Sequence, residues 1–536
     1  MKKIISTTMM FAMIITALTS CSMVSNSDQP PVPNPEELAD ATIIWYGTGG
    51  GNRDYEILTN FRQFYKAKSE TYDHVNIVAQ YKASGSLYSK FNEYDYEEIN
   101  ELKETTDEEL DKMLGLGNQY LYLSNVQPGA TYRFALDFKK TLHRQLIETE
   151  PYGESNCDFT CPDSLTNFIN WAATHYPAKK YILVMADHGG GYYLPDERPE
   201  YAMTRGMLYD DGHDKKCFSA KSFAKGVKNA KVRPDGIVFY LCLMNNIEFL
   251  YEVKDLTDYT VCSTYTMWAL GGALESLADN MASGLDTKEA LANFVDANVD
   301  SWDREEEKYV TPGRPHYFDL TLTETCRLND LTPVLKEFTD RLVDTYQNGT
   351  PEQRARIDEC TANAVKVHAS YPFYDFAKYM EVCFMKLPDV FDEEFYQRLQ
   401  TSFNACLVKQ RYAKPLTEHN YQVDYSVNLG VKGRILKYTH IDMRQAVLAY
   451  CPDGTLEVYK RRDPGQTQSG LLDDFDLIES STWGSTFADT YQQSAFDKLV
   501  GWSRWLLINE SAPPAWSPSS SKYDLPEDDM SVIPTL

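Results

Sequence analysis

Two short apolar runs that end at reactive side chains limit what this chain can fold into. The first run, Tyr181–Ala186, is followed by Asp187 and His188, and the second, Gly236–Leu241, ends directly at Cys242. Continuous apolar runs of this length are typical of strands buried on both faces, as in a parallel sheet covered by helices. The carboxyl ends of such strands meet at one edge of the sheet. We therefore expect the imidazole and the thiol to lie together at that edge.

The neighbouring segments predict the alternating strands and helices of an α/β fold. Strands are expected over residues 42–46, 75–81, 181–186, 236–241 and 259–262, and helices over 55–68, over 163–176 and beyond Asn245. The helix over 163–176 has the apolar face of a helix that covers a sheet, made by Leu165, Phe168, Ile169 and Ala172. In the last helix, Asn245 can act as the N-cap with Glu248 at the third position. The pattern predicts a mostly parallel sheet flanked by helices.

The first residues have the form of a bacterial lipoprotein signal. Lys2 and Lys3 precede an apolar stretch, Ile4–Leu18, that is too short and wrongly flanked for a membrane span. Cys21 follows at the position that is lipidated in such proteins. An ordinary secretory signal with a chance cysteine is the alternative. The predicted location is the bacterial cell envelope, at its periplasmic or outer face, with the lipid as the membrane anchor.

Composition divides the chain into further segments. Residues 1–20 are the predicted signal peptide and 21–40 a lipidated tether rich in Ser, Asn and Pro. The α/β domain is expected over 41–300, with a Tyr-rich acidic insertion at about 82–127. Helices over 328–346 and 391–407 and a hairpin at 446–459, turning at Asp453-Gly454, predict a C-terminal α+β extension over 301–510. Residues 511–536 are rich in Pro and Ser and are expected to be disordered.

Charge and cysteine usage restrict the partners. A net charge of −26 at pH 7 argues against nucleic acid, because phosphate contacts need clustered Lys and Arg. We expect a monomer. Apart from Cys21, the cysteines lack the dense spacing of a disulfide scaffold. Cys157 and Cys161 could pair or bind metal, but no second pair of this kind supports a zinc site.

Cys242 and His188 have the chemistry of a nucleophile and its base. A cysteine attacks a carbonyl group as the thiolate, so it needs a neighbouring group that takes its proton. Glycines 189–191 let the backbone approach a substrate, and the amide groups of Gly189 and Cys242 could stabilise an oxyanion. A buried structural cysteine and a histidine in a turn are the alternative interpretation.

A series of short motifs lies between residues 165 and 263. In order they are Leu165–Trp171, Tyr176-Pro177-Ala178, Asp187–Gly191, Leu208–Asp211, Cys242-Leu243-Met244, Ile247-Glu248, Tyr251-Glu252 and Val261-Cys262-Ser263. Together they resemble the clostripain family of cysteine peptidases, which are relatives of the caspases and gingipains. Weaker likeness extends from Thr42 to Ser503, so the resemblance covers most of the mature chain.

The resemblance implies a caspase-like α/β fold for residues 41–300 and a peptidase built on a dyad. His188 and Cys242 would form the dyad, and Gly189 would contribute to the oxyanion hole. The implied reaction is hydrolysis of peptide bonds in proteins or peptides through an acyl-enzyme. His188 would first receive the thiol proton and then protonate the leaving amine.

Two departures from the family change what the resemblance implies about the substrate. Where the family has Asp-Ala-Cys, this chain has Tyr240-Leu241-Cys242, so one acidic group that would bind Arg or Lys is missing. The family's acidic, Gly-rich stretch is here 263–272, which contains no carboxylate. A substrate pocket would be lined by Tyr240, Ser263, Met267 and Trp268. Such a pocket would favour an apolar or aromatic side chain, because an unpaired buried cation is costly.

The segment Tyr209–Asp214 concentrates three carboxylates and an imidazole. It could hold calcium or another cation, but it lacks the calcium-loop spacing, and we favour a solvated loop. No other cofactor is expected. The resemblance also implies that this region can be a processing site, and basic residues follow it at Lys215, Lys216, Lys221 and Lys225. Because the pocket lacks the acidic group, we expect no self-cleavage at these lysines.

Other bases and other functions are less well supported. His175 ends a helix before a proline and is expected to be structural, His213 ranks below His188, and Asp187 is expected to be structural or orienting. A binding or adhesion lipoprotein on an inactive peptidase scaffold is the alternative function. Metal-dependent hydrolysis is disfavoured because the chain has no H-E-x-x-H or similar ligand pair.

Overall fold

The computed structural model describes part of the chain. The described residues are 38–51, 53–85, 126–153, 157–192, 207–212, 216–265, 267, 272–309, 318–362, 364, 366–368, 371–412, 428–429, 439–442, 446–450, 456–461, 475–481 and 492–506. The chain divides into two units, Met1–Leu38 and Ala39–Leu536, and every element below belongs to the second. The predicted signal peptide, Cys21, most of the tether, most of the acidic insertion and the C-terminal tail lie outside the described residues.

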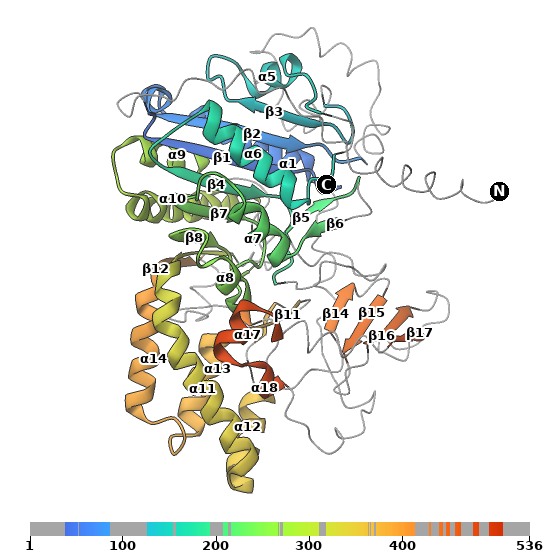
Figure 1. Ribbon diagram of the computed structural model, residues 1–536, viewed down its shortest axis with the longest axis vertical. Coiled ribbons are helices and arrows are strands. Elements are labelled where there is room, and N and C mark those ends of the chain that lie inside the picture. The colour runs from blue at the N-terminus through green and yellow to red at the C-terminus, as the bar shows by residue number, and fades with distance from the viewer. Residues whose placement is uncertain are drawn as a thin grey trace, which may run out of the picture. The chain divides into compact units, whose positions relative to one another are not determined.

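The main sheet has eight strands in the order β12-β9-β8-β7-β4-β1-β2-β3 (Figure 1). Its strands are β1 (Ala41–Thr48), β2 (Val75–Lys82), β3 (Thr131–Ala135), β4 (Tyr181–Ala186), β7 (Gly236–Tyr240), β8 (Tyr259–Cys262), β9 (Asp319–Glu324) and β12 (Leu407–Tyr412). The pairs β2–β1, β1–β4, β4–β7 and β7–β8 are parallel. The outer pairs β2–β3, β8–β9 and β9–β12 are antiparallel. The predicted α/β class with a mostly parallel sheet is confirmed.

Helices cover both faces of this sheet because alternate residues of each central strand are buried on opposite sides. In β4, Leu183 and Met185 face one core, and Ile182 and Val184 face the other. The first core is covered by α6 (Pro162–His175), α7 (Ala220–Lys228) and α8 (Ile247–Val253), and the second by α1 (Asp54–Arg62), α9 (Leu274–Ala282) and α10 (Thr287–Tyr309) (Figure 1). Double-sided burial explains why the central strands are continuous apolar runs.

The predicted helices around the central strands are present, with one error in capping. The helix α6 buries the four residues expected of it, which are Leu165, Phe168, Ile169 and Ala172. The helix α8 starts at Ile247, and its N-cap position is Asn246, whose side chain makes no capping bond. The predicted cap at Asn245 is wrong because the Asn245 side chain donates instead to Thr264 Oγ1 at 2.9 Å. A tertiary partner has replaced the local one.

The segment beyond residue 300 contributes strands to the main sheet and a helical layer. Its helices are α11 (Leu328–Asn348), α12 (Pro351–Ala362), α13 (Phe376–Lys386), α14 (Glu393–Cys406), α17 (Ala495–Val500) and α18 (Ser503–Leu506). Trp502 and Trp505 are fully buried, as predicted, and Trp502 lies 5.3 Å from the ring of Phe376. The boundary expected near residue 300 falls inside α10, and β9 and β12 extend the sheet that carries the central strands.

Smaller elements complete the described part of the chain. They are η2 (Gln63–Lys66), η3 (Ser69–Asp73), α5 (Leu142–Glu148), β5 (Met207–Asp210), β6 (Lys216–Phe218), η5 (Thr325–Arg327), β10 (Lys366–His368), β11 (Tyr371–Asp375) and β13 (Asn428–Leu429). A separate antiparallel sheet contains β14 (Thr439–Asp442), β15 (Ala446–Tyr450), β16 (Leu456–Arg461) and β17 (Phe475–Ser481). The pairing of β15 with β16 confirms the predicted hairpin. Within the described ranges, none of the helices has the length and apolarity that crossing a bilayer requires.

Candidate active site

His188 and Cys242 leave the sheet side by side. Ala186 at the end of β4 pairs with Tyr240 at the end of β7, so the residues two positions further on emerge at the same level. Both His188 and Cys242 are partly exposed. The structure therefore brings together the chain segments that carry His188 and Cys242, the two residues that the sequence singled out.

The backbone at Gly189 is in direct contact with the backbone at Cys242. A Cβ atom added to Gly189 would lie 2.2 Å from the Cys242 carbonyl oxygen and 2.8 Å from its amide nitrogen. No larger residue fits here without displacing the chain that carries the thiol. Glycine at position 189 is required by this close approach.

The Cys242 thiol is held in a mostly protein environment. The backbone N–H of Met267 donates to Cys242 Sγ at 3.2 Å. Burial raises the pKa of Cys242, whereas the Met267 N–H and the positive charge of Arg53 lower it and Asp187 raises it. The net direction of these effects on the pKa of Cys242 is upward.

Two leucines with left-handed backbone conformation flank the reactive residues. Leu243, directly after the thiol, has φ of 63°, and Leu208 has φ of 55°. Leu243 N–H donates to the carbonyl of Tyr265 at 2.9 Å, and Leu208 N–H donates to the carbonyl of His188 at 3.1 Å. Such a conformation costs about 1–3 kcal/mol for a residue other than glycine. Both leucine side chains are fully buried, and their packing offsets this strain.

Asp187 connects His188 to the loop after β1. Its buried carboxylate accepts the backbone N–H of Tyr209, and burial raises its pKa well above the usual range. Gly50, with φ of 54°, packs so closely that an added Cβ would lie 2.2 Å from Asp187 Oδ1. The Gly-rich loop after β1 therefore packs on Asp187, the residue before His188. These contacts are those of a residue with a structural or orienting role, which is what we expected for Asp187.

The residues expected to line a substrate pocket have different surroundings. Tyr240 is 5% exposed, and its ring lies 6.5 Å from Trp45 and 6.0 Å from Trp302. Met267 packs, partly buried, on the same core. Ser263 is fully buried, and its hydroxyl lies 2.9 Å from the carbonyl oxygen of Tyr265 and 3.0 Å from Asp319 Oδ1. Trp268 lies outside the described residues.

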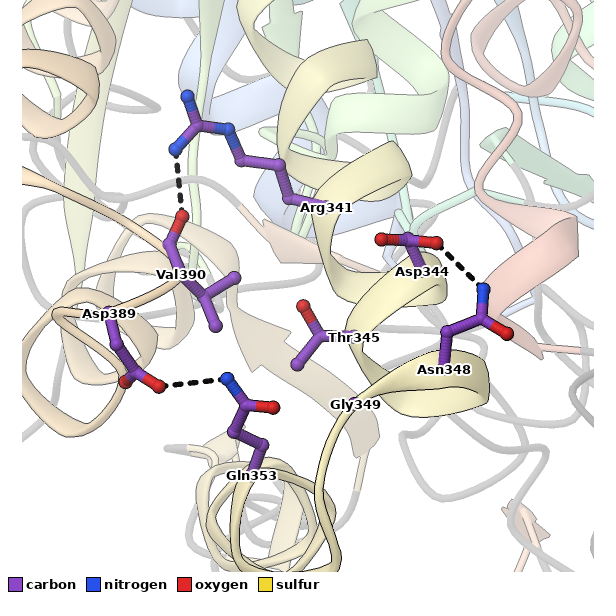
Figure 2. Close-up of a pocket in the computed structure, with 8 residues that line it drawn as sticks. All are labelled: Arg341, Asp344, Thr345, Asn348, Gly349, Gln353, Asp389 and Val390. Atoms are coloured by element: carbon purple, nitrogen blue, oxygen red, sulfur yellow. Dashed lines mark hydrogen bonds between the residues drawn. The ribbon is translucent and has the colours of Figure 1, made fainter.

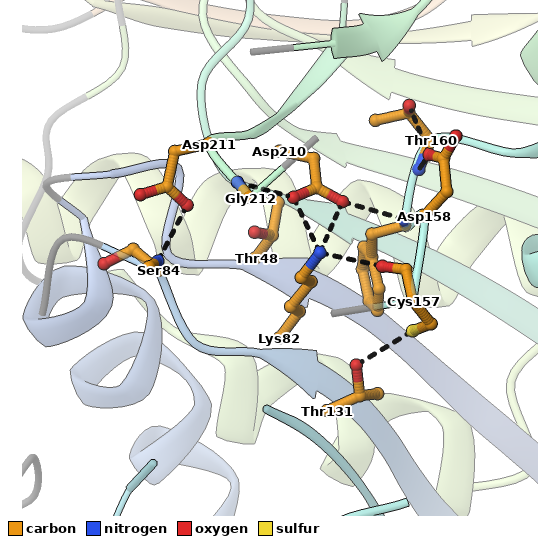
Figure 3. Close-up of polar contacts among 12 residues, drawn as sticks. Thr48, Lys82, Ser84, Thr131, Cys157, Asp158, Thr160, Asp210, Asp211 and Gly212 are labelled. Carbon is orange, nitrogen blue, oxygen red and sulfur yellow. Dashed lines mark hydrogen bonds and ion pairs between the residues drawn. The ribbon is translucent and has the colours of Figure 1, made fainter. Parts of the chain in front are cut away.

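Asp210 does not belong to a solvated loop. It is fully buried, and Lys82 Nζ donates to both of its carboxylate oxygens at 2.7 Å (Figure 3). The backbone N–H groups of Phe159 and Gly212 donate to it at 2.9 and 3.1 Å. The solvated-loop interpretation is therefore wrong for this residue, because an internal cation holds the carboxylate that calcium would use. His213 and Asp214 lie outside the described residues.

The neighbouring cysteine pair and a distant hollow lack the features of a second active site. Cys157 Sγ lies 3.1 Å from Thr131 Oγ1, and its carbonyl accepts from Lys82 Nζ at 2.7 Å. Across the described part of the chain, no three His, Cys, Asp or Glu side chains are arranged to hold a metal ion. A polar hollow of about 320 Å³ (Figure 2) is lined by Arg341, Asp344, Thr345, Asn348, Gly349, Gln353, Asp389 and Val390. Its side chains bond to one another, as Gln353 does to Asp389 at 2.8 Å.

Several buried or charged residues at this edge of the sheet were not predicted. Lys82 is a lysine at the end of an apolar strand, which was the one available signal that it is buried. Asp319 is the first residue of β9 and lies far from Cys242 in the sequence. No local pattern indicated that it would be buried beside the segment that follows Cys262. Arg53 follows the Gly-rich loop. Its charge acts on the Cys242 thiol because the fold brings these distant segments together, and the sequence does not indicate this.

Comparisons with known proteins agree with the motifs. A family model described as "Clostripain family" matches residues 89–426, which confirms the resemblance. Clostripain from Hathewaya histolytica is 28% identical over 132 residues, which are 23% of this chain and 24% of that relative. The match thus spans about a quarter of the relative's length.

Solved structures of secreted and zymogen proteins are also similar. A secreted C11 cysteine protease from Bacteroides thetaiotaomicron, "iotapain", has a TM-score of 0.47 at 17% identity, covering 70% of this chain and 87% of that chain. An inactive zymogen C11 protease from Parabacteroides distasonis has a TM-score of 0.45 at 14% identity, covering 88% and 99%.

The Lys82–Asp210 pair predicts a large stability effect. In Lys82→Met, the Asp210 carboxylate is left buried without its cation, so we expect the free energy of unfolding to fall by about 3–5 kcal/mol in urea denaturation. The control is Arg233→Met, which removes the ion pair between Arg233 and Asp258. The side chains of these two residues are 48% and 53% exposed. That variant should lose less than about 1 kcal/mol. Equal losses in both variants would contradict the prediction.

The surroundings of Cys242 predict how its alkylation depends on pH. Because burial raises the pKa of this thiol, its rate of reaction with iodoacetamide should keep rising with pH beyond the range of an ordinary thiol, about 8.5. The measurement is mass spectrometry of the Cys242 peptide after timed labelling, with glutathione as the reference thiol. A rate that is already maximal near pH 6 would indicate a preformed thiolate and contradict the prediction.

Proposed function

This chain belongs to the clostripain family, and on that premise we propose that it is a cysteine endopeptidase in which His188 and Cys242 act as a catalytic dyad. The contact between Gly189 and Cys242 carries the proposal, because it brings the chain after His188 against the nucleophile. The register of β4 and β7 supports the same arrangement. A buried inert cysteine would not need a glycine-only contact with the histidine segment.

The proposed reaction has two half-steps. Cys242 Sγ attacks the carbonyl carbon of the peptide bond while His188 takes the thiol proton, and His188 then gives a proton to the leaving amine. Water hydrolyses the resulting thioester, with His188 as the base, and the thiol is restored.

The backbone amides of Gly189 and Cys242 are the proposed oxyanion donors. The direct contact between the backbones of Gly189 and Cys242 supports this proposal. A donor of this kind contributes about a hundred- to a thousand-fold to the rate in other hydrolases. The left-handed turn at Leu243 directs the chain away from the thiol immediately after the Cys242 amide.

We propose that the protein is exported and lipid-anchored through Cys21, acts on protein or peptide substrates, and is a monomer. The supporting observations are in the sequence: two lysines, a short apolar stretch and a cysteine at the end of the stretch.

The proposed substrate preference is not strict for Arg or Lys. Tyr240 takes the position of the family's acidic residue, and its ring packs between Trp45 and Trp302. Burial raises the pKa of Tyr240, and the carboxylate of Glu275 adds to this effect. Glu275 is thus the residue to examine if a basic side chain is accepted. With Met267 on the same core, the wall beside Cys242 is mainly apolar.

A peptide library tests the activity. The purified mature chain should cleave peptides, and Cys242→Ala and His188→Ala should each lose at least about a thousand-fold in kcat. Cys326→Ala, which removes an exposed thiol, is the matched control and should keep full activity. If the folded and reduced wild type cleaves nothing, the proposal fails in favour of a binding lipoprotein or an unprocessed precursor.

The same library tests the pocket. We expect cleavage after Leu or Phe to exceed cleavage after Arg or Lys, because the wall offers no buried carboxylate at position 240. In Tyr240→Asp the preference should move towards Arg and Lys by about tenfold or more, as one new charge pair in a poorly solvated site is worth at least 1.4 kcal/mol. Efficient wild-type cleavage after Arg, with none after Leu or Phe, would refute the proposed preference.

A further inference from the structure

A buried carboxylate on the strand next to the site organises the chain around the thiol. Asp319, the first residue of β9, is fully buried. Its Oδ1 atom accepts from Ser263 Oγ at 3.0 Å and from the backbone N–H groups of Thr264 and Tyr265 at 2.7 and 3.1 Å. Its Oδ2 atom lies 3.3 Å from Thr321 Oγ1. Three donors from one turn therefore converge on a single oxygen.

The register of the sheet explains why a side chain is needed at this position. β8 and β9 pair from Tyr259 opposite Glu324 to Cys262 opposite Thr321. Beyond Cys262 the chain leaves the ladder, so the next amides lose the carbonyl partners that a longer strand would have had. Buried amides need acceptors. The Asp319 carboxylate supplies the acceptor and holds the segment 263–265 in a tight turn.

This turn is bonded to the residues that follow the nucleophile. Leu243 N–H donates to the Tyr265 carbonyl at 2.9 Å, and Asn245 N–H donates to the Ser263 carbonyl at 2.8 Å. Two residues beyond Tyr265, the Met267 N–H donates to Cys242 Sγ at 3.2 Å. Asp319 thus holds residues 263–265 in position, and the Met267 N–H, shortly after them in the chain, donates to the thiol.

We propose that Asp319 is a positioning residue for the nucleophile: it fixes the turn 263–265 so that Leu243 keeps its left-handed conformation and the Met267 N–H stays on Cys242 Sγ. Asp319 does not touch the substrate. The proposal rests on the proposed role of Cys242 as the nucleophile. Because an N–H donor stabilises a thiolate, loss of the turn lowers the reactivity of the sulfur.

Two substitutions separate a positioning role from a merely structural one. Asp319→Ala removes the acceptor for all three donors, whereas Asp319→Asn keeps one carbonyl oxygen that can still accept from the turn. We therefore expect the thiol reactivity to decrease from wild type to Asn to Ala. His188, Asp187 and Arg53, the titratable or charged groups placed around the thiol, are unchanged in both variants.

Alkylation of Cys242 by iodoacetamide is the primary readout, since it needs no substrate and no peptidase activity. In the full mature chain, Asp319→Ala should slow alkylation at neutral pH by about tenfold or more, corresponding to an upward shift of about one unit in the pKa of the thiol. Asp319→Asn should give an intermediate rate, clearly below that of the wild type and above that of Asp319→Ala. Where cleavage is measurable, kcat should fall in parallel with the alkylation rate.

The matched control is Asp497→Ala. Asp497 is another buried carboxylate that accepts from a serine, with Ser503 Oγ at 2.7 Å, but it lies in α17, outside the segments around the thiol. This variant should lose stability and keep the wild-type alkylation rate. An unchanged rate in folded Asp319→Ala would overturn the proposal, and if that variant does not fold, an unchanged rate and unchanged kcat in Asp319→Asn would do so. Wild-type alkylation without any cleavage would instead count against the peptidase function alone.

Discussion

Parallel pairing of β4 with β7 is the constraint on which the rest of the candidate site depends. With Ala186 opposite Tyr240, the chains that continue to His188 and Cys242 emerge at one level and touch through Gly189. A shift of one residue in this register would turn every side chain of the strand to the other face. The buried residues on both faces of β4, such as Met185 and Val184, make that shift costly. Core packing therefore fixes how closely the backbone segments of His188 and Cys242 approach each other.

The edge of the sheet carries polar groups and strained backbone that the core around it must support. Asp187, Asp210 and Asp319 are all buried there, and each is bonded to backbone N–H groups of a neighbouring loop. Leu208 and Leu243 hold left-handed conformations beside the same loops. The carboxylates thus accept hydrogen bonds from backbone N–H groups at the points where the strands, and the backbone hydrogen bonds between them, end. This explains why a region with so few regular hydrogen bonds can still hold a thiol in one position.

Local patterns in the sequence were enough to predict the central strands, the helix α6 and the approach of the segments that carry His188 and Cys242, because burial imposes a periodicity on each element separately. Lys82 and Asp319 could not be predicted in this way. Lys82 meets Asp210 across 128 positions, and Asp319 meets Thr264 across 55. The cap at Asn245 was misassigned for a related reason, since Thr264 competes for its side chain. Contacts between distant segments decide these positions, and single-sequence periodicity contains no information about them.

The orientation of the buried carboxylates also bears on the substrate. Asp319 accepts from the backbone N–H groups of Thr264 and Tyr265, and Asp187, whose pKa burial raises well above the usual range, accepts from that of Tyr209. In the proposed pocket, a basic side chain beside Tyr240 would have to pair with Glu275, whose charge acts on Tyr240, or displace one of these bonds. Displacement is unfavourable at a buried position, and an apolar side chain needs neither. On the proposed substrate preference, Asp187 and Asp319 would not replace an acidic residue at position 240, because their bonds already hold the neighbouring loops in place.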